Sequence, residues 1–223
     1  MAEPAIIHED NHILVVIKPQ NIPTVADDSG DQSLQEQLKE HTKGFVGIVH
    51  RLDRVTGGVM VFAKTSKAAG RLTEQVQNGN FKKMYLAVVA GVPKQRSATL
   101  INYLAKDGDK NMVAVVPQTT TGAKRAELSY HTIDTRDGNS LIGVDLATGR
   151  SHQIRVQMRH IGNAIVGDQK YGEQTKTGNI ALWAHELSFN HPTTGDHLKF
   201  VVNPPEDGVW AGFDFRRKEH LHR

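Results

Sequence analysis

The segment that most constrains the fold of this chain runs from residue 47 to residue 63. An apolar stretch at its start gives way to polar residues, and the triplet Thr56-Gly57-Gly58 stands before a second apolar run at 59–63. Apolar runs of this length indicate buried strands, and paired glycines break a strand sharply. We therefore expect two buried strand segments joined by a tight loop.

An acidic residue lies at the centre of that loop. Asp53 stands between Arg51 and Arg54, and we expect the two cations to compensate part of its charge. A carboxylate that is kept ionised in this way can act as a base or as a nucleophile. The alternative is an acid that only fixes the loop by pairing with its neighbours. The segment by itself leaves both interpretations open.

The pattern along the rest of the chain predicts many strands and few helices. Strands are expected at 13–17, 59–63, 81–90, 100–103, 112–116, 126–133, 141–146, 187–191 and 198–202, and helices at 32–41, from Ser66 as its cap to Gly79, and at 151–161. Asp137-Gly138 is a hairpin signal. Because the connections are short, the sequence predicts an α+β fold with a mostly antiparallel, mixed β-sheet flanked by a few helices. No linker or repeat is visible, so we expect a single domain, 1–223.

Composition excludes some classes of protein. No apolar stretch approaches the ~20 residues needed to span a bilayer, and the start of the chain lacks the features of a signal peptide. The chain has no cysteine, so it has no disulfides, which suits a cytoplasmic protein. Its formal net charge of +3 favours an acidic partner only weakly, and the oligomeric state is not readable.

A second polar pattern lies at residues 148–158. On a helix His152, Arg155 and Arg159 would be spaced three and four residues apart and would share one stripe, while the apolar residues between them face the core. A solvated helix face would have the same spacing.

Two strings give these patterns a common meaning. His-Arg-Leu-Asp-Arg-x-Thr-x-Gly at 50–58 resembles the signature of the RluA-type pseudouridine synthases, and Gly-Arg-x-His-Gln-Ile-Arg at 149–155 is similar to the second motif of that family. Lys-Met-Tyr-Leu-Ala at 83–87 resembles the family's strand with an active-site tyrosine. Stretches 9–19, 167–172 and 182–185 also resemble segments of that family. The resemblance therefore runs from about residue 7 to residue 202.

The resemblance implies a site and a fold. Asp53 matches the family's catalytic aspartate, Arg155 the arginine that pairs with it, and Tyr85 the active-site tyrosine; the fold expected is the pseudouridine synthase fold. The basic side chains beside them are expected to bind RNA: Arg51, Arg54, Arg150 and His152. Arg51 is expected to lie near the place that a flipped-out uridine leaves.

The implied reaction isomerises specific uridines to pseudouridine in ribosomal or transfer RNA. It oxidises nothing and imports no group, so we expect no metal and no cofactor. The chain has 12 histidines, but no His-Glu-x-x-His or comparable spacing supports a metal hydrolase. A non-catalytic RNA-binding module of the same fold is the stronger alternative, although such a module has no need of the acid, the tyrosine and the arginine together.

The sequence also departs from the family pattern. Gly57 stands where many relatives have serine, and Asn21 where they have glycine; asparagine tolerates the left-handed backbone that glycine adopts. We expect a catalytic domain only, without the small amino-terminal RNA-binding domain of several relatives. RNA binding is then expected to come from the catalytic domain itself.

Overall fold

In a computed structural model the described residues are 4–107, 112–172 and 178–215. The chain divides into two units, one formed by Met1–Met84 with Trp183–Pro204 and the other by Tyr85–Leu182 with Pro205–Arg223. The described residues contain three α-helices and many strands. Whether the two units make up the single domain expected from the sequence stays a prediction.

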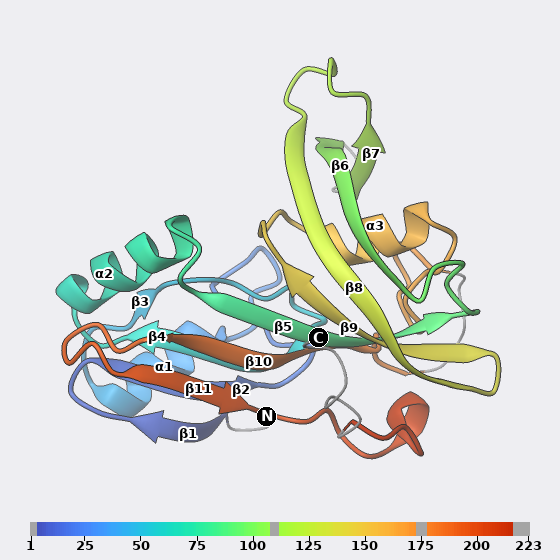
Figure 1. Ribbon diagram of the computed structural model, residues 1–223. Coiled ribbons are helices and arrows are strands. Elements are labelled where there is room, and N and C mark those ends of the chain that lie inside the picture. Colours follow the sequence, from blue (N-terminus) through green and yellow to red (C-terminus); the bar gives the residue numbers. More distant parts are fainter. Residues whose placement is uncertain (1–3, 108–111, 173–177, 216–223) are drawn as a thin grey trace. The chain divides into compact units, whose positions relative to one another are not determined.

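The first unit is built on a mixed sheet. Its strands are β1 (Ala5–Glu9), β2 (Ile13–Lys18), β3 (Gly47–Ile48), β4 (Gly57–Ala63), β10 (Leu182–Asn190) and β11 (His197–Val201). Strands β1, β2, β4 and β10 lie side by side in that order, with β11 paired to β10 and β3 to β4 (Figure 1). The β4–β10 pair is parallel, and the other pairs are antiparallel. Every residue of β4 is buried, which explains the continuous apolar run at 59–63.

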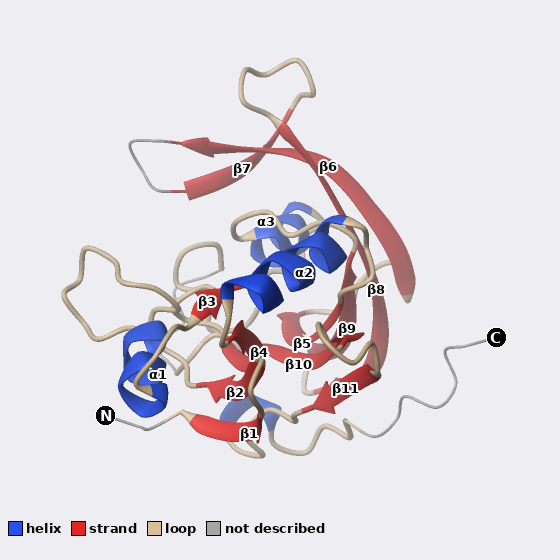
Figure 2. Cartoon of the chain, turned by 90° about the vertical axis from the view of Figure 1, so that its left-hand side faces the viewer, coloured by secondary structure: helices blue, strands red, loops and turns tan. Residues whose placement is uncertain are grey.

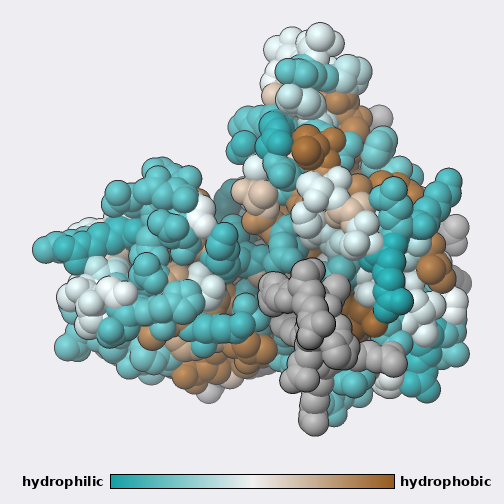
Figure 3. All heavy atoms as spheres, in the orientation of Figure 1, coloured by the Kyte–Doolittle hydropathy of each residue, from teal (hydrophilic) through white to brown (hydrophobic). Residues whose placement is uncertain are grey.

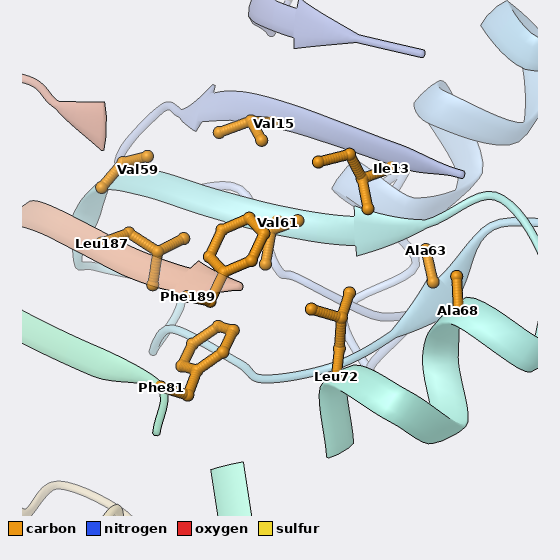
Figure 4. Close-up of a cluster of buried hydrophobic side chains, with 10 residues drawn as sticks. All are labelled: Ile13, Val15, Val59, Val61, Ala63, Ala68, Leu72, Phe81, Leu187 and Phe189. Carbon is orange, nitrogen blue, oxygen red and sulfur yellow. The ribbon is translucent and has the colours of Figure 1, made fainter. Parts of the chain in front are cut away.

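The core of the first unit lies between these strands and the helix α2 (Ser66–Gln77). The rings of Phe81 and Phe189 stack with their centroids 5.5 Å apart, and Leu72 of α2 points toward them (Figure 4). Val61 of β4 completes this contact from the sheet (Figure 4). This apolar packing fixes β4, and with it the end of the loop that carries Asp53.

Two helices of the first unit begin at side-chain caps. The helix α1 (Leu34–Thr42) has a capping box, in which Ser33 Oγ accepts from the amide of Glu36 at 3.3 Å and the Glu36 carboxylate accepts from the amide of Ser33 at 2.8 Å. Helix α2 was expected to have Ser66 as its cap, and this is wrong. Thr65 has the extended backbone of a cap, and its hydroxyl accepts from the amide of Ala68 at 3.1 Å. The outer face of α2 is hydrophilic (Figure 3).

The second unit contains the longer strands. They are β5 (Lys82–Ala90), which begins in the first unit, β6 (Ser97–Asp107), β7 (Met112–Val116), β8 (Lys124–Arg136) and β9 (Asn139–Leu146), in the spatial order β5-β9-β8-β6-β7. Figure 2 shows the long β6–β8 ribbon with β7 beside β6. At the turn between β8 and β9, Asp137 (φ 49°) and Gly138 (φ 75°) both have left-handed backbones, as the hairpin signal predicted. The predicted α+β class with a mostly antiparallel, mixed sheet is confirmed.

The helix α3 (Gln153–His160) begins two residues later than expected. His152 precedes it with a left-handed backbone (φ 54°), so His152 does not share the helical stripe predicted for it with Arg155 and Arg159. Arg155 is buried and Arg159 is exposed, which also contradicts a common polar face. A short 3₁₀-helix, Gly208–Trp210, follows near the end of the described chain. None of the helices in the described ranges has the length and hydropathy that a membrane crossing requires.

Candidate active site

The loop that carries Asp53 is anchored through its backbone. The carbonyl of Leu52 accepts from the Thr24 hydroxyl at 2.9 Å, and that of Val55 accepts from the Gln20 side chain at 3.0 Å. The carbonyl of Arg54 accepts from the amide of Asn21 at 2.8 Å. Segment 20–24 therefore holds the loop on both sides of Asp53. Asn21 itself has a left-handed backbone (φ 67°), as its place in the sequence predicted.

A buried lysine completes this anchoring. Lys18, at the end of β2, is fully buried and donates to the carbonyls of Pro19 at 2.8 Å and Arg54 at 2.9 Å. Burial lowers the pKa of Lys18 from 10.5 to about 7, against the charge of Asp53, which raises it. Sequence reasoning missed this residue, because lysine is almost never fully buried and the carbonyls that accept from it come from the fold.

The cations that flank Asp53 behave differently from the expectation. Arg54 donates to Asp27 at 3.1 Å and to Asp31 at 2.7 Å, and carbonyl and hydroxyl oxygens of the same neighbourhood take its remaining donors. Arg51 is exposed and has no hydrogen bond or ion pair among the described residues. Arg51 and Arg54 form no hydrogen bond or ion pair with Asp53 in the described ranges, and the partial compensation of its charge by these two cations stays a prediction. Lys18 is one cation whose charge interacts with Asp53.

The two glycines after the loop permit a close approach of strands. Gly58 has φ 122° and pairs with Ala184 of β10, whose backbone nitrogen would lie 2.6 Å from a Cβ at position 58. A Cβ at Gly57 would lie 2.9 Å from Gln20 Cγ and would meet the ring of Trp183. The space that a serine would need at position 57 is thus filled by the indole.

The depressed pKa of Lys18 predicts a pH dependence of stability. The unfolded chain binds a proton at Lys18 up to pH 10.5, whereas the folded chain releases it near pH 7. Between these values the unfolded state holds more protons, so the free energy of unfolding rises with pH, by at most about 1.4 kcal/mol per pH unit. Lys18→Met is expected to remove this rise in urea unfolding between pH 7 and pH 10. The control Lys39→Met, at an exposed position of α1, should keep it; equal slopes in the parent and Lys18→Met would contradict the assignment.

In the second unit Arg155 is held by a buried carboxylate. Its guanidinium donates from Nε and Nη2 to the two oxygens of Asp168, at 2.8 and 2.7 Å, and both side chains are buried. Burial alone would raise the pKa of Asp168, but the bonds from Arg155 outweigh it and hold this pKa below its ordinary value. The Tyr171 ring lies under the guanidinium at 5.0 Å from its carbon. The amides of Lys170 and Tyr171 also donate to Asp168.

The other expected site residues of this unit lie on β5 and in the segment before α3. Tyr85 is buried on β5. His152 Nδ1 lies 2.7 Å from the Tyr171 hydroxyl, and the left-handed backbone of His152 turns it toward that contact. Arg150 is exposed and donates from Nε to the carbonyl of Arg125 at 3.0 Å. Asp53 belongs to the first unit, and Tyr85 and Arg155 belong to the second. The pairing of Arg155 with Asp53 therefore stays a prediction.

Metal ligands were not expected from the sequence. In the three described ranges, no group of three or more His, Asp or Glu side chains is placed to hold a metal ion. The mechanism without a metal stays a prediction, to be decided by experiment.

Comparison with known proteins places the chain among enzymes of RNA modification. The model of a family described as RNA pseudouridylate synthase matches residues 12–160, more than half of the chain. Ribosomal large subunit pseudouridine synthase D of Pseudomonas aeruginosa is 34% identical over 230 residues, which cover 93% of this chain and 70% of that protein. An uncharacterized RNA pseudouridine synthase of Bacillus subtilis, YjbO, is 33% identical over 220 residues. The aligned region covers 93% of this chain and 76% of that protein.

Solved structures agree on the fold. The human RNA pseudouridylate synthase domain containing 1 has a TM-score of 0.76 and 23% identity, over 91% of this chain and 84% of that chain. The human RNA pseudouridylate synthase domain containing 4 has a TM-score of 0.73 and 22% identity, over 90% and 88%. The predicted family, fold and enzyme class are confirmed. The chain belongs to the RNA pseudouridylate synthase family, whose members are isomerases that act on RNA.

Proposed function

We propose that this enzyme converts uridine to pseudouridine in ribosomal RNA, with Asp53 as the reacting carboxylate. The name of the Pseudomonas aeruginosa relative, which is 34% identical, favours ribosomal RNA over transfer RNA. Tyr85 and Arg155 complete the proposed site, with Tyr85 against the uracil and Arg155 beside the acid. The relative supports the choice of RNA, and the motif at 50–58 supports the choice of the acid.

The observation that carries the role of Asp53 is the backbone anchoring of its loop. Lys18, Gln20, Asn21 and Thr24 hold that loop through its carbonyls. Contacts to its backbone therefore hold the loop whatever the Asp53 carboxylate binds, which favours a chemical role for this acid over a purely structural one. A carboxylate on a rigidly held loop suits chemistry, because catalytic groups must keep their geometry during the reaction.

The reaction itself needs no added reagent. The bond from ribose C1′ to uracil N1 breaks, the uracil rotates, and a new bond forms from C1′ to C5. The hydrogen that leaves C5 is balanced by one gained at N1, so the product has the formula of the substrate. A carboxylate can serve this sequence as nucleophile at C1′ or as base for the departing proton.

The two arginines beside Asp53 take different parts in this proposal. Asp53 is only partly exposed, so a uridine within a stem must flip out to reach it. Arg51 is exposed and without a partner among the described residues, so its planar guanidinium is available to stack where the flipped base was. Arg54 is occupied by Asp27 and Asp31 and is assigned to bracing the loop.

The experiment that tests the function is pseudouridine mapping of total RNA from cells with and without the gene. We expect at least one pseudouridine of large-subunit ribosomal RNA to disappear, and the pure enzyme to restore it on the RNA from the deletion strain. Loss of a transfer RNA site instead would move the substrate to that class. RNA binding without pseudouridine formation by the pure protein would favour the non-catalytic binding module.

A further inference from the structure

The start of β5 carries a cation that the protein does not compensate. Lys83 is partly buried, yet it has no hydrogen bond and no ion pair among the described residues. Its neighbour Lys82, which points to the opposite face of the strand, is exposed. A lysine that only increases solubility would extend into water, as Lys82 does.

Lys83 has no compensating carboxylate among the described residues. Burial lowers the pKa of Lys83, and no carboxylate of the described residues raises it. Burial and, to a smaller extent, the charge of the nearby Lys83 ammonium lower the pKa of His50 from 6.5 to about 3. His50 is therefore neutral, and it is not a counterion for Lys83.

The hydrogen bonds of His50 also favour an anion near this place. His50 Nε2 accepts from the amide of Val61 at 3.2 Å, so the proton of the neutral ring resides on Nδ1. His50 Nδ1 is buried and has no hydrogen-bond partner in the part of the chain that the structure describes. The ring packs edge-on against Phe81, with centroids 5.3 Å apart, and Phe81 directly precedes β5. The imidazole therefore lies beside the start of the strand that carries Lys83.

A partly desolvated cation without a counterion costs free energy in the folded protein. A bound ligand that supplies the missing negative charge would explain why the protein keeps a cation at this position. The sequence places two other groups nearby: Arg51 follows His50 directly, and Tyr85 stands two residues after Lys83 on the same face of β5. A step of two strand residues is about 6.6 Å, which is of the order of the distance between a base and its own phosphate.

We propose that Lys83 binds a backbone phosphate of the RNA at the target nucleotide, as an electrostatic contact beside the base that Tyr85 faces. This inference rests on the proposed function, because it takes the ligand to be RNA. Lys83 is a substrate-binding residue in this scheme and takes no part in bond breaking. It supplies binding that is the same before and during the reaction, so its loss should weaken association and leave the chemical step unchanged.

The test compares Lys83→Met with Lys83→Arg and with the control Lys82→Met. Binding of a fluorescent single-stranded oligouridylate is measured by anisotropy from 50 to 300 mM KCl. In Lys83→Met we expect affinity at low salt to fall about tenfold and the slope of log K against log salt to become shallower by about 0.7. Lys83→Arg keeps the charge and should restore the slope, and Lys82→Met should keep the parent slope.

Two further measurements separate this contact from a structural role. The melting temperature of Lys83→Met should equal or exceed that of the parent, because an uncompensated cation is removed. The single-turnover rate on an unmodified large-subunit ribosomal RNA transcript, at saturating enzyme, should stay within about twofold of the parent. A parent slope in Lys83→Met, a lowered melting temperature with no rescue by arginine, or an equal loss in Lys82→Met would overturn the assignment. Absence of RNA binding by the parent would instead refute the proposed function, and the phosphate contact with it.

Discussion

Asp53→Asn is expected to abolish pseudouridine formation while the protein stays folded. The change keeps the shape of the side chain and removes its charge, and asparagine is neither a nucleophile nor a base at neutral pH. Loss of such a group lowers the rate by about a thousandfold or more. The measurement is single-turnover conversion of an unmodified large-subunit ribosomal RNA transcript by the pure protein. Circular dichroism and the melting temperature should match the parent, because the loop is anchored by its backbone.

The matched control for this variant is Asp28→Asn. Asp28 is an exposed acid in the neighbouring loop and makes no hydrogen bond or ion pair among the described residues. Asp28→Asn removes the same charge from the segment whose Asp27 and Asp31 pair with Arg54, and this variant should react at the parent rate. Turnover by Asp53→Asn above a trace would exclude Asp53 as the reacting group. Equal losses in both variants would point to a general effect of charge on RNA binding.

Asp168→Asn is expected to have the largest effect on stability. The carboxylate is fully buried and accepts two hydrogen bonds from the buried guanidinium of Arg155. Removing the charge of Asp168 takes the bidentate carboxylate away from a buried cation, and breaking a buried ion pair in this way costs about 3–5 kcal/mol of the free energy of unfolding. Urea unfolding at pH 7 measures this difference. The pKa of Asp168 lies below its ordinary 3.8, so the contribution of the pair is full above that pH and is lost as the pH falls below it.

Two variants control for the cause of this loss. Arg155→Met combined with Asp168→Leu leaves no buried charge, and it should be more stable than Asp168→Asn alone. Lys199→Ala breaks the surface pair with Glu186 and should change stability by less than about 1 kcal/mol. A fall of less than 1 kcal/mol in Asp168→Asn would show that the pair does not stabilise the unit.

Much of the secondary structure could be read from local patterns. The apolar run at 59–63 predicted β4, and Asp137-Gly138 predicted the β8–β9 turn, because strand burial and left-handed turns depend on neighbouring residues. The limits of α3 could not be read in this way. His152 adopts a left-handed backbone in contact with Tyr171, 19 residues further on, and no local signal reports such a contact.

In the candidate site, too, local sequence patterns predicted some features, and contacts between distant residues determined others. The motif at 50–58 pointed to Asp53, but proximity in sequence did not reveal the ion pairs around its loop. The acids that pair with Arg54 are Asp27 and Asp31, 27 and 23 residues away, and one cation whose charge interacts with Asp53 is Lys18, at the end of β2. Ion pairs depend on tertiary neighbours, so a sequence pattern cannot assign them without a fold.

The indole that fills the space above Gly57 links two distant positions of the chain. Position 57 can accept a hydroxymethyl group only if Trp183 retracts, and Trp183 donates its indole proton to the carbonyl of Val202 at 3.0 Å. A serine at position 57 therefore requires a smaller side chain at position 183. The Val202 carbonyl would then rely on His185 Nδ1, which lies 2.9 Å from it. The two sites must change as a pair, so the route from this sequence to the serine-containing form passes through an intermediate that is either overpacked or hollow.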